Sequence, residues 1–460
     1  MKIALVALSL NEFPPLALGY LKAAALNDSE LKDILEFFIY DEAIDDYTKN
    51  PEKKDMLVSN LVKKNPDIIL FSCYLWNTRQ MLELGSTLKK KSNAKIILGG
   101  PAVTYDAEAV LEKNPSVDIV IRGEAEITFV ELLKELMKCQ KPPFAISPLQ
   151  LGVRRRFLSM LKNTSRASAR VFLTNDSLQN IAGITYRKDG KTINTKPRAL
   201  ITNLDDIPSP YLIGNLEVNE KALIETHRGC FFRCGYCLEY KSGPIREFSV
   251  DRTRQEIKYV VEHGARKITL CNSIFNNSLE RATELCNMLH EFKEYNLEIN
   301  VDSYAEWLTK EMVDLYVYGG ITGTEIGLQS INANVLRNIR RPSLNKEKFK
   351  EKIRMLDSAG IKTCLHVILG LPDETLSSFQ ETAKYAFSTE PTDISFFKLL
   401  MMPGTELQRF SEKFGIKYNP EPPYEVISTP TMSSEDIKRA ELFVKKAYRE
   451  FILKSPNKIS

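Results

Sequence analysis

Three cysteines stand close together in the segment THRGCFFRCGYCLEY. Cys230, Cys234 and Cys237 are separated by three and then by two residues. Three thiolates in one short loop can hold a metal ion or an iron–sulfur cluster. A structural zinc site needs four ligands, and His227 could supply the fourth. A [4Fe–4S] cluster held by three cysteines would instead leave one iron open for chemistry, so the spacing indicates a metal centre of one kind or the other.

The cysteine loop follows an apolar run at 221–229 that has the pattern of a β-strand. Further strand candidates continue the series at 267–272, 297–304, 323–330, 362–371 and 393–401, and the segments between them carry helical spacing. Six such units fall short of the eight that close a barrel. We therefore predict an open, partial barrel of six β/α units with the cysteine loop at its carboxyl face, where catalysis is expected.

An earlier series of apolar runs predicts a second α/β unit. The runs lie at 2–8, 35–41, 67–74, 94–100 and 117–123, and helix-like segments separate them. Continuous apolar runs of this kind are typical of strands buried in a parallel sheet. The sequence thus predicts a doubly wound, Rossmann-like parallel sheet, whose ligands would sit at the carboxyl ends of the strands.

The chain is expected to divide into four parts. These are the first sheet at 1–138, a basic connector at 139–215, the partial barrel at 216–405 and a C-terminal helical extension at 406–460. In the connector the periodicity weakens, and we predict a basic helix near 150–165 and a hairpin near 181–196 turned at Asp189-Gly190.

The charge of the chain is balanced overall and uneven locally. The formal net charge is +4, from 63 basic and 59 acidic residues, but residues 138–198 hold thirteen basic residues against Asp176 and Asp189. That segment is either a solvated connector or a surface for an anionic partner such as RNA. With 43% hydrophobic residues and no apolar run near the roughly 18 that span a bilayer, we expect a cytoplasmic globular protein without a membrane partner.

At the cysteine loop the sequence resembles the radical S-adenosylmethionine (SAM) superfamily. Its CxxxCxΦC loop matches Cys230, Cys234, the aromatic Tyr236 and Cys237. The resemblance implies that these cysteines hold a [4Fe–4S] cluster whose open iron chelates SAM, with Tyr236 near the adenine. Reductive cleavage of SAM would then yield a 5′-deoxyadenosyl radical.

Other barrel strands carry weaker matches to this superfamily. The resemblance implies SAM or substrate contacts at the ends of three strands. The residues are Asn272 and Ser273, Glu325 and Gln329, and, for the adenine of SAM, Gly370 and Leu371. An ordinary polar strand face, or a simple strand-ending turn, is the alternative for each pair.

The first sheet resembles the cobalamin-binding domain that precedes the radical SAM barrel in one large subclass. The resemblance rests on three loops and implies cobalamin contacts from Ser72, Tyr74, Trp76, Gly99, Gly100, Pro101, Arg122, Gly123 and Glu124. Many cobalamin proteins ligate cobalt with a histidine, yet the first histidine here is His227. We therefore expect no imidazole on the lower face, with the rings of Tyr74 and Trp76 there instead. A flavodoxin-like sheet without a ligand is the alternative.

Taken together, the resemblance implies a cobalamin-dependent radical SAM enzyme that methylates an unactivated carbon of a small-molecule, peptide or RNA substrate. One SAM would supply a methyl group to the cobalt and a second would yield the radical, with electrons from a donor such as flavodoxin or ferredoxin. A rearrangement, cyclisation or ring contraction without net methyl transfer is the first alternative. A nucleic-acid-binding protein with a structural metal cluster is the second.

Overall fold

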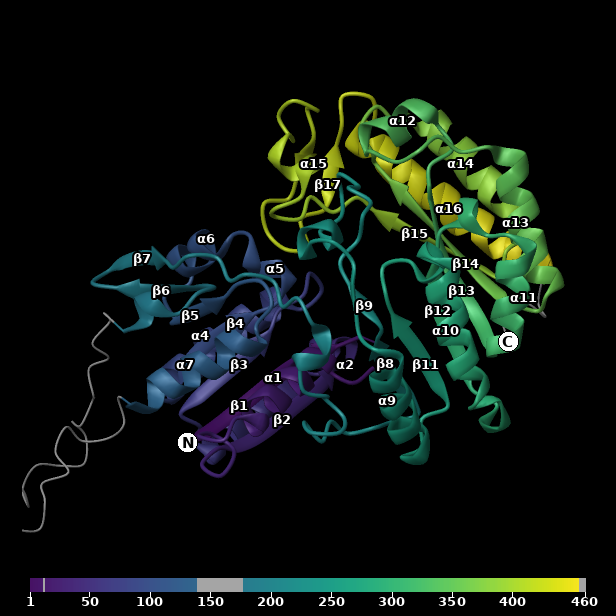
Figure 1. The fold of residues 1–460 in the computed structure, drawn as a ribbon. Coiled ribbons are helices and arrows are strands. Elements are labelled where there is room, and N and C mark those ends of the chain that lie inside the picture. Colours follow the sequence, from purple (N-terminus) through teal and green to yellow (C-terminus); the bar gives the residue numbers. More distant parts are fainter. Residues whose placement is uncertain (11–12, 139–176, 455–460) are drawn as a thin grey trace, which may run out of the picture.

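The computed structural model describes residues 1–10, 13–138 and 177–454. Two α/β domains lie side by side, each built on its own parallel sheet (Figure 1). The helix expected near 150–165 falls outside the described residues, as does most of the basic segment.

The first sheet has five parallel strands in the predicted places. They are β1 (Lys2–Ser9), β2 (Glu36–Ala43), β3 (Ile68–Ser72), β4 (Lys95–Gly99) and β5 (Ile119–Ile121). The sheet order is β2-β1-β3-β4-β5, continued by β6 and β7. The direction of chain order therefore reverses between β1 and β3, and ligands of doubly wound sheets bind beside such a reversal.

Helices cover both faces of this sheet. They are α1 (Leu16–Asn27), α2 (Ile44–Lys49), α3 (Pro51–Lys64), α4 (Thr78–Lys91), α5 (Pro101–Thr104), α6 (Ala107–Lys113) and α7 (Glu126–Lys138). Apolar residues of α1 and α7 form a core on one face, and those of α3, α4 and α6 form a core on the other. Buried on both faces, the central strands need to be apolar along their whole length.

The predicted hairpin exists, and it extends the first sheet. A short helix, η3 (Leu178–Asn180), precedes β6 (Ile184–Lys188), which pairs antiparallel with β5 and leads into β7 (Lys191–Asn194). Asp189 and Gly190 both have positive φ, as a two-residue hairpin turn requires. Ile184 and Tyr186 add to the core beneath α1 and α7, so part of the expected connector packs as first-domain structure.

The second sheet has six parallel strands, as predicted. They are β8 (Lys221–Glu225), β11 (Lys267–Cys271), β12 (Glu298–Ser303), β13 (Ile321–Gln329), β14 (Lys362–Leu369) and β15 (Asp393–Lys398). They pair in chain order, and β8 and β15 stay at opposite edges. The barrel is therefore open.

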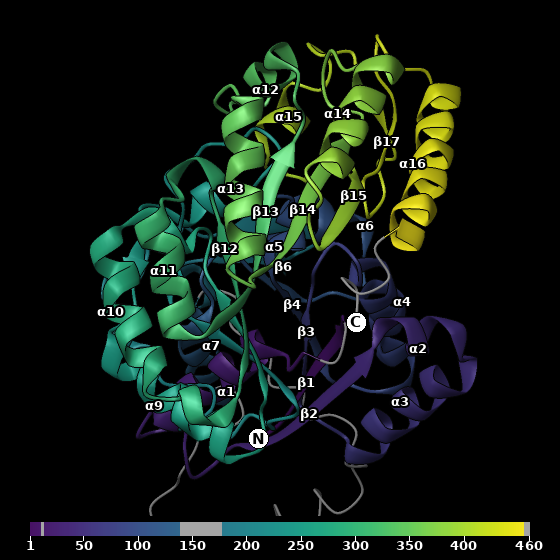
Figure 2. The same cartoon turned by 90° about the vertical axis from the view of Figure 1, so that its right-hand side faces the viewer.

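Helices cover the outer face of the second sheet, as Figure 2 shows. The longer ones are α9 (Val250–Glu262), α10 (Leu279–His290), α11 (Lys310–Gly319), α13 (Lys346–Ser358) and α14 (Leu376–Ser388), and α12 (Ala333–Asn338) is shorter. Short helices η4 (Leu204–Asp206), η5 (Glu239–Ser242), η6 (Phe275–Asn277), η7 (Lys293–Tyr295) and η8 (Ala305–Trp307) lie in the loops. The inner face is left for ligands.

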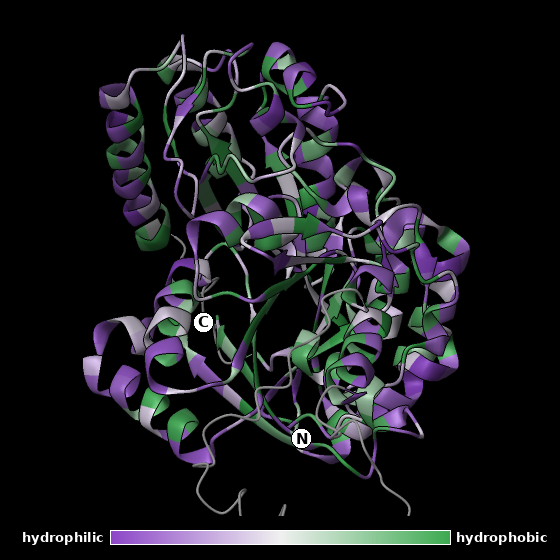
Figure 3. Ribbon diagram, turned by 90° about the vertical axis from the view of Figure 1, so that its left-hand side faces the viewer, coloured by the Kyte–Doolittle hydropathy of each residue, from purple (hydrophilic) through white to green (hydrophobic). Residues whose placement is uncertain are grey.

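The C-terminal segment closes one edge of the partial barrel. It contains α15 (Glu406–Arg409), β16 (Lys417–Tyr418), β17 (Val426–Ser428) and the predicted amphipathic helix α16 (Ser434–Lys454). Tyr448 of α16 donates a hydrogen bond of 2.6 Å to Asp393 at the start of β15. Figure 3 shows α16 with mixed polar and apolar residues beside apolar strands, as a helix that covers a sheet edge requires.

Candidate functional site

The cysteine loop is closed at its base by a short antiparallel pair of strands. β9 (His227–Arg228) precedes the loop and β10 (Arg246–Glu247) follows it. At Gly229, φ is +95° and a Cβ would lie 2.5 Å from the carbonyl oxygen of Pro244, so only glycine fits. Further along, Gly235 is fixed through its backbone, because its N–H donates to Ile339 and its carbonyl accepts from Leu407.

The three thiols gather in this loop in a largely buried setting. Cys234 is buried, and Cys230 and Cys237 are partly buried. Burial raises the pKa of both Cys230 and Cys237, the latter to about 12, and the two thiols and Cys234 lie near enough to influence one another's charge. Without iron the thiols of Cys230 and Cys237 are therefore protonated, and binding of iron would release these protons. The Glu239 N–H donates to Cys237 Sγ at 3.4 Å, the kind of contact that stabilises a cluster thiolate.

His227 forms a hydrogen bond within the protein and is not positioned as a fourth ligand. Its Nε2 accepts a hydrogen bond of 3.0 Å from the N–H of Ser273. Burial lowers the pKa of His227 to about 4, which keeps the ring neutral. Within residues 1–10, 13–138 and 177–454, no three cysteine, histidine or acidic side chains converge on a single ion position. The arrangement suits a cluster, whose cysteines each bind a different iron, better than a mononuclear zinc site.

Tyr236 is held by an arginine that the sequence did not single out. Arg341 donates from Nη1 to the Tyr236 hydroxyl at 3.3 Å and from Nη2 to the Gly327 carbonyl at 2.7 Å. Its guanidinium also lies 5.7 Å from the centre of the Tyr304 ring. Arg341 follows the short helix α12, far along the chain from the cysteines, and has no local motif that could have marked it.

Two predicted SAM residues present buried oxygen atoms without hydrogen-bond partners. These are Asn272 Oδ1, after β11, and Gln329 Oε1, at the end of β13. A Cβ on Gly327 would lie 2.6 Å from the Gln329 amide nitrogen, so the glycine makes room for this side chain. Buried acceptors usually have partners. The ammonium and hydroxyl groups of SAM are donors that fit them.

The other predicted SAM residues already have partners within the protein. Ser273 donates its hydroxyl to the Gly229 carbonyl at 2.8 Å and so supports the cysteine loop. At the end of β14, the Gly370 N–H donates to the buried Glu374 carboxylate at 3.0 Å, and a Cβ there would lie 2.8 Å from Val426. Leu371 is fully buried. The adenine contact of Gly370 and Leu371 stays a prediction.

Glu325 belongs to a polar cluster on the inner face of the partial barrel. Its carboxylate lies 3.2 Å from His366 Nε2 on β14. Burial opposes a positive charge on His366, but hydrogen bonds with Cys364 and Glu325 outweigh it and raise the pKa of His366 to about 10. Burial, with the Glu325 charge nearby, raises the pKa of Asp302 on β12 to about 7. Asp302 and His366 were not predicted as site residues, although each stands on the polar face of an alternating strand.

Two aromatic residues follow β3. Tyr74 and Trp76 stack with ring centres 4.5 Å apart, and Trp76 Nε1 donates to the Leu8 carbonyl at 3.1 Å. Burial raises the pKa of Tyr74 to about 12, assisted by Glu225 and Cys271 of the barrel. Tyr74 is therefore near these barrel strands, and the next residue, Leu75, packs against the hydrophobic core of the barrel. Ser72 is buried just before this pair, with its carbonyl bonded to Asn77.

The two glycines after β4 have different surroundings. A Cβ on Gly99 would meet no other atom within 4 Å, so open space lies over it. Gly100 has φ of +113°, and a Cβ there would lie 2.4 Å from the Cys73 carbonyl oxygen. Pro101 then begins α5. The open space over Gly99 leaves room for a ligand to contact the protein backbone there. At Gly100 a glycine is needed because its backbone packs closely against that of Cys73.

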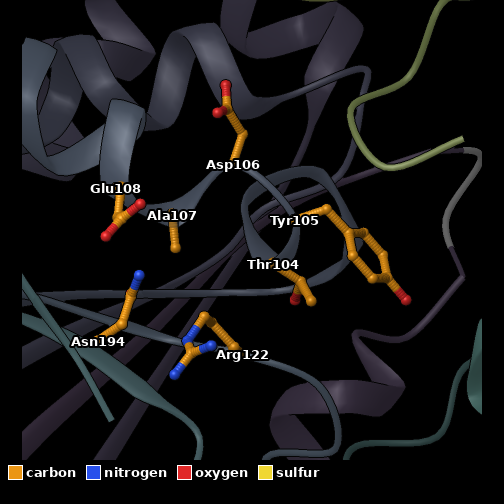
Figure 4. A pocket seen from close by; sticks show the side chains of 7 residues that line it. All are labelled: Thr104, Tyr105, Asp106, Ala107, Glu108, Arg122 and Asn194. Atoms are coloured by element: carbon orange, nitrogen blue, oxygen red, sulfur yellow. The ribbon is translucent and has the colours of Figure 1, made fainter. Parts of the chain in front are cut away.

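The loop after β5 carries the last predicted cobalamin residues. Figure 4 shows Arg122 beside a polar pocket, and its lining residues are Thr104, Tyr105, Asp106, Ala107, Glu108, Arg122 and Asn194. Arg122 donates to the carbonyls of Ile184 and Thr195, and the Gly123 N–H donates to Thr104. Glu124 instead turns toward the barrel, where it pairs with Arg228 and Arg246. No cysteine lines the pocket.

Two family models match the two domains. The model of the B12 binding domain matches residues 3–133, and that of the radical SAM superfamily matches residues 224–386. Together they cover well over half of the chain. The chain belongs to the radical SAM enzymes that carry an N-terminal B12-binding domain. The cofactors of this family are a [4Fe–4S] cluster, SAM and cobalamin, and the predicted fold and family are confirmed.

Known proteins of this radical SAM family align with nearly the whole chain. The cobalamin-dependent radical SAM methyltransferase TokK of Streptomyces tokunonensis is 24% identical over 90% of this chain, which spans 58% of TokK. An anaerobic magnesium-protoporphyrin IX monomethyl ester cyclase of Cereibacter sphaeroides is 25% identical over 96% of this chain and 68% of its own.

A solved structure supports the same fold for this radical SAM enzyme. The methyltransferase TsrM of Kitasatospora setae superposes with a TM-score of 0.69 at 15% identity, over 94% of this chain and 80% of TsrM. Among the helices in the described part of the chain, none has the length and apolar character to cross a bilayer.

Proposed function

We propose that this chain is a cobalamin-dependent radical SAM methyltransferase that methylates an unactivated carbon. The observation that carries the proposal is the meeting of the two cofactor regions. Tyr74, at the strand end expected to contact cobalamin, lies near enough to Glu225 and Cys271 of the barrel for their charges to raise its pKa, and Glu124, after β5, pairs with Arg228 and Arg246 at the base of the cysteine loop. A substrate between them would face both cofactors. When bound, the cofactors supply a methyl group and a radical that activates the acceptor carbon.

The chain's own residues have distinct parts in this proposal. Cys230, Cys234 and Cys237 hold the cluster, and the unpartnered oxygens of Asn272 and Gln329 accept hydrogen bonds from SAM. Arg341 orients Tyr236 beside SAM. Open space over Gly99 receives the nucleotide tail of cobalamin. The polar cluster of Asp302, Glu325 and His366 faces the substrate from the barrel strands.

The proposal can be tested without knowing the substrate. The protein is reconstituted with iron, sulfide and cobalamin under anaerobic conditions, reduced and given SAM. Methyl transfer from SAM leaves S-adenosylhomocysteine, and reductive cleavage leaves 5′-deoxyadenosine. We expect both products by mass spectrometry, with S-adenosylhomocysteine formed only when cobalamin is present. Formation of 5′-deoxyadenosine alone, in protein fully loaded with cobalamin, would contradict methyl transfer.

A second candidate is a cyclisation or rearrangement on the same architecture, without net methyl transfer. The similarity to the Cereibacter sphaeroides cyclase, at 25% identity against 24% for the methyltransferase TokK, favours it. The same assay separates the two candidates, because this second one forms no S-adenosylhomocysteine.

Two partners belong to the proposal. Reductive cleavage of SAM requires an external one-electron donor such as flavodoxin or ferredoxin. Binding of nucleic acid by the basic segment, residues 138–198, stays a prediction, and most of that segment lies outside the described residues. If RNA binds there, the dissociation constant should rise steeply with added salt. A constant unchanged between low and physiological salt would discard RNA as a partner.

A further inference from the structure

One carboxylate of the first domain reaches both strands that close the cysteine loop of the second. Arg228 on β9 and Arg246 on β10 stand directly opposite each other in the antiparallel pair. Glu124 Oε1 lies 2.8 Å from Arg246 Nη2 and 3.4 Å from Arg228 Nη1. Its other oxygen lies 3.1 Å from Arg246 Nη1.

The two arginines need this carboxylate to stay together. Like charges directly opposite each other in a sheet repel. Both side chains are also close to nine-tenths buried, with 11% of Arg228 and 8% of Arg246 exposed, so water cannot neutralise them. Glu126 and Glu225 also bind Arg228, at 2.7 and 3.0 Å, but neither has a recorded contact with Arg246. Among the acidic side chains in the described part of the chain, Glu124 alone forms ion pairs with arginines of both strands.

The same carboxylate also fixes the segment that connects the domains. The Ile201 N–H donates to Glu124 Oε2 at 2.9 Å, and the Ile201 carbonyl accepts from Arg246 at 2.6 Å. Burial opposes ionisation of Glu124, but the bonds from Arg246 and the Ile201 N–H prevail and hold its pKa below the usual range. Glu124 is therefore an ionised junction of three segments: the loop after β5, the connector and the β9–β10 pair.

We propose that Glu124 is a positioning residue that holds the cysteine loop in register with the cobalamin loops of the first domain. Arg228 lies two residues before Cys230, so a shift of β9 would move the first cluster ligand. Both Glu124 oxygens are engaged by the protein, which assigns the residue to positioning and not to direct contact with cobalamin. The inference rests on the proposed function, since only an enzyme that uses both cofactors needs this register.

The test compares Glu124→Gln with Glu131→Gln. Glu131 pairs with Arg198 between α7 and the connector but has no recorded contact with the β9–β10 pair, so it is a matched control. Amide hydrogen exchange of residues 227–247 is measured on the protein without cofactors. We expect exchange about tenfold faster in Glu124→Gln and unchanged in Glu131→Gln, because only the first change frees the base of the loop.

A second readout uses the reconstituted protein. The magnetic interaction between the reduced cluster and Co(II) cobalamin, recorded by electron paramagnetic resonance, should change in Glu124→Gln and stay at the wild-type value in Glu131→Gln. S-Adenosylhomocysteine formation, which needs both domains, should fall about 100-fold in Glu124→Gln. Iron and cobalamin contents should match the wild type.

Two results would overturn the proposal. One is a Glu124→Gln protein with wild-type exchange and wild-type magnetic interaction. The other is loss of cobalamin binding with exchange unchanged, which would make Glu124 a cofactor ligand. If Glu124→Gln does not fold, Arg246→Lys keeps the charge, loses the two-pronged contact and should give the same changes. A wild-type protein that forms no S-adenosylhomocysteine would refute the proposed function, while hydrogen exchange would still report on Glu124.

Discussion

The two sheets differ in which of their faces is covered. In the first, β3 is buried at every position, whereas β8 and β11 of the second alternate between buried and partly exposed residues. Helices pack on both faces of the first sheet and on one face of the second. A ligand of the first domain can therefore reach only strand ends, where glycine and backbone contacts dominate. A ligand of the second can lie on the strands themselves and meet their side chains.

The largest effect that tests this difference between the two sheets is expected at the cysteine loop that we propose as the cluster site. Cys234→Ala should remove iron and reduce 5′-deoxyadenosine below detection, because we propose this cysteine as one of the three cluster ligands. Cobalamin affinity should stay within about twofold of the wild type, since the other sheet binds it. The measurements are iron content, product analysis and cobalamin titration.

Cys286→Ala is the control for loss of a thiol from the same domain. Cys286 is fully buried on α10, and its replacement should leave iron content and SAM cleavage intact. A large loss of cobalamin affinity in Cys234→Ala would show that the two regions do not bind their cofactors independently.

Much of this division could be predicted from the sequence. Continuous apolar runs located the five parallel strands of the first sheet, and the six runs after 221 located the second. The spacing of the three cysteines is local, so the sequence alone was enough to propose the cluster loop. The hairpin at Asp189-Gly190 was also found, since its turn residues are adjacent.

Contacts between distant parts of the chain left no such signal. Arg341 reaches Tyr236 across 105 residues, and Arg246 reaches Glu124 across 122. An arginine in a polar loop looks the same in the sequence whether it faces water or a buried partner. The pairing of β6 with β5 was missed for a related reason, because a hairpin's pattern does not say which sheet edge it joins.

The next prediction compares the loss of stability from a Phe→Ala substitution in each of the two sheets. Phe71 on β3 is fully buried, whereas Phe397 on β15 is 50% exposed and packs edge-on against His366. Phe71→Ala should lower the free energy of unfolding by about 3–5 kcal/mol, because it leaves a cavity. Phe397→Ala should cost less than about 1 kcal/mol. Urea titration of each variant measures both values, and equal losses would mean that the inner face of the second sheet is as tightly packed as the first.

A smaller effect separates the adjacent glycines at the end of β4. Gly99→Ala places a methyl group in open space, so the unfolding temperature should hold while cobalamin affinity falls about tenfold. Gly100→Ala meets the Cys73 carbonyl at a positive φ and should instead destabilise the apoprotein by at least about 1 kcal/mol. Cobalamin titration and thermal unfolding distinguish the two. Undiminished affinity in Gly99→Ala would remove this strand end from the cobalamin site.

The smallest effect concerns the inner face of the barrel and depends on pH. Burial first, and then Glu325, raises the pKa of Asp302 to about 7, while His366 opposes the shift and Glu239 adds to it. The folded protein holds this proton more tightly than the unfolded chain does. Ionisation of Asp302 therefore lowers the free energy of unfolding as pH rises from about 4 to 7. Asp302→Asn should therefore gain about 1 kcal/mol over the wild type at pH 8, and the gain should shrink toward pH 5. Thermal unfolding across this range measures it. The control is Glu298→Gln, because Glu298 is an exposed carboxylate at the start of the same strand. If the stability difference between Asp302→Asn and the wild type stayed constant across the pH range, burial and Glu325 would not be disfavouring the charge on Asp302. The two sheets would then differ in packing but not in electrostatics.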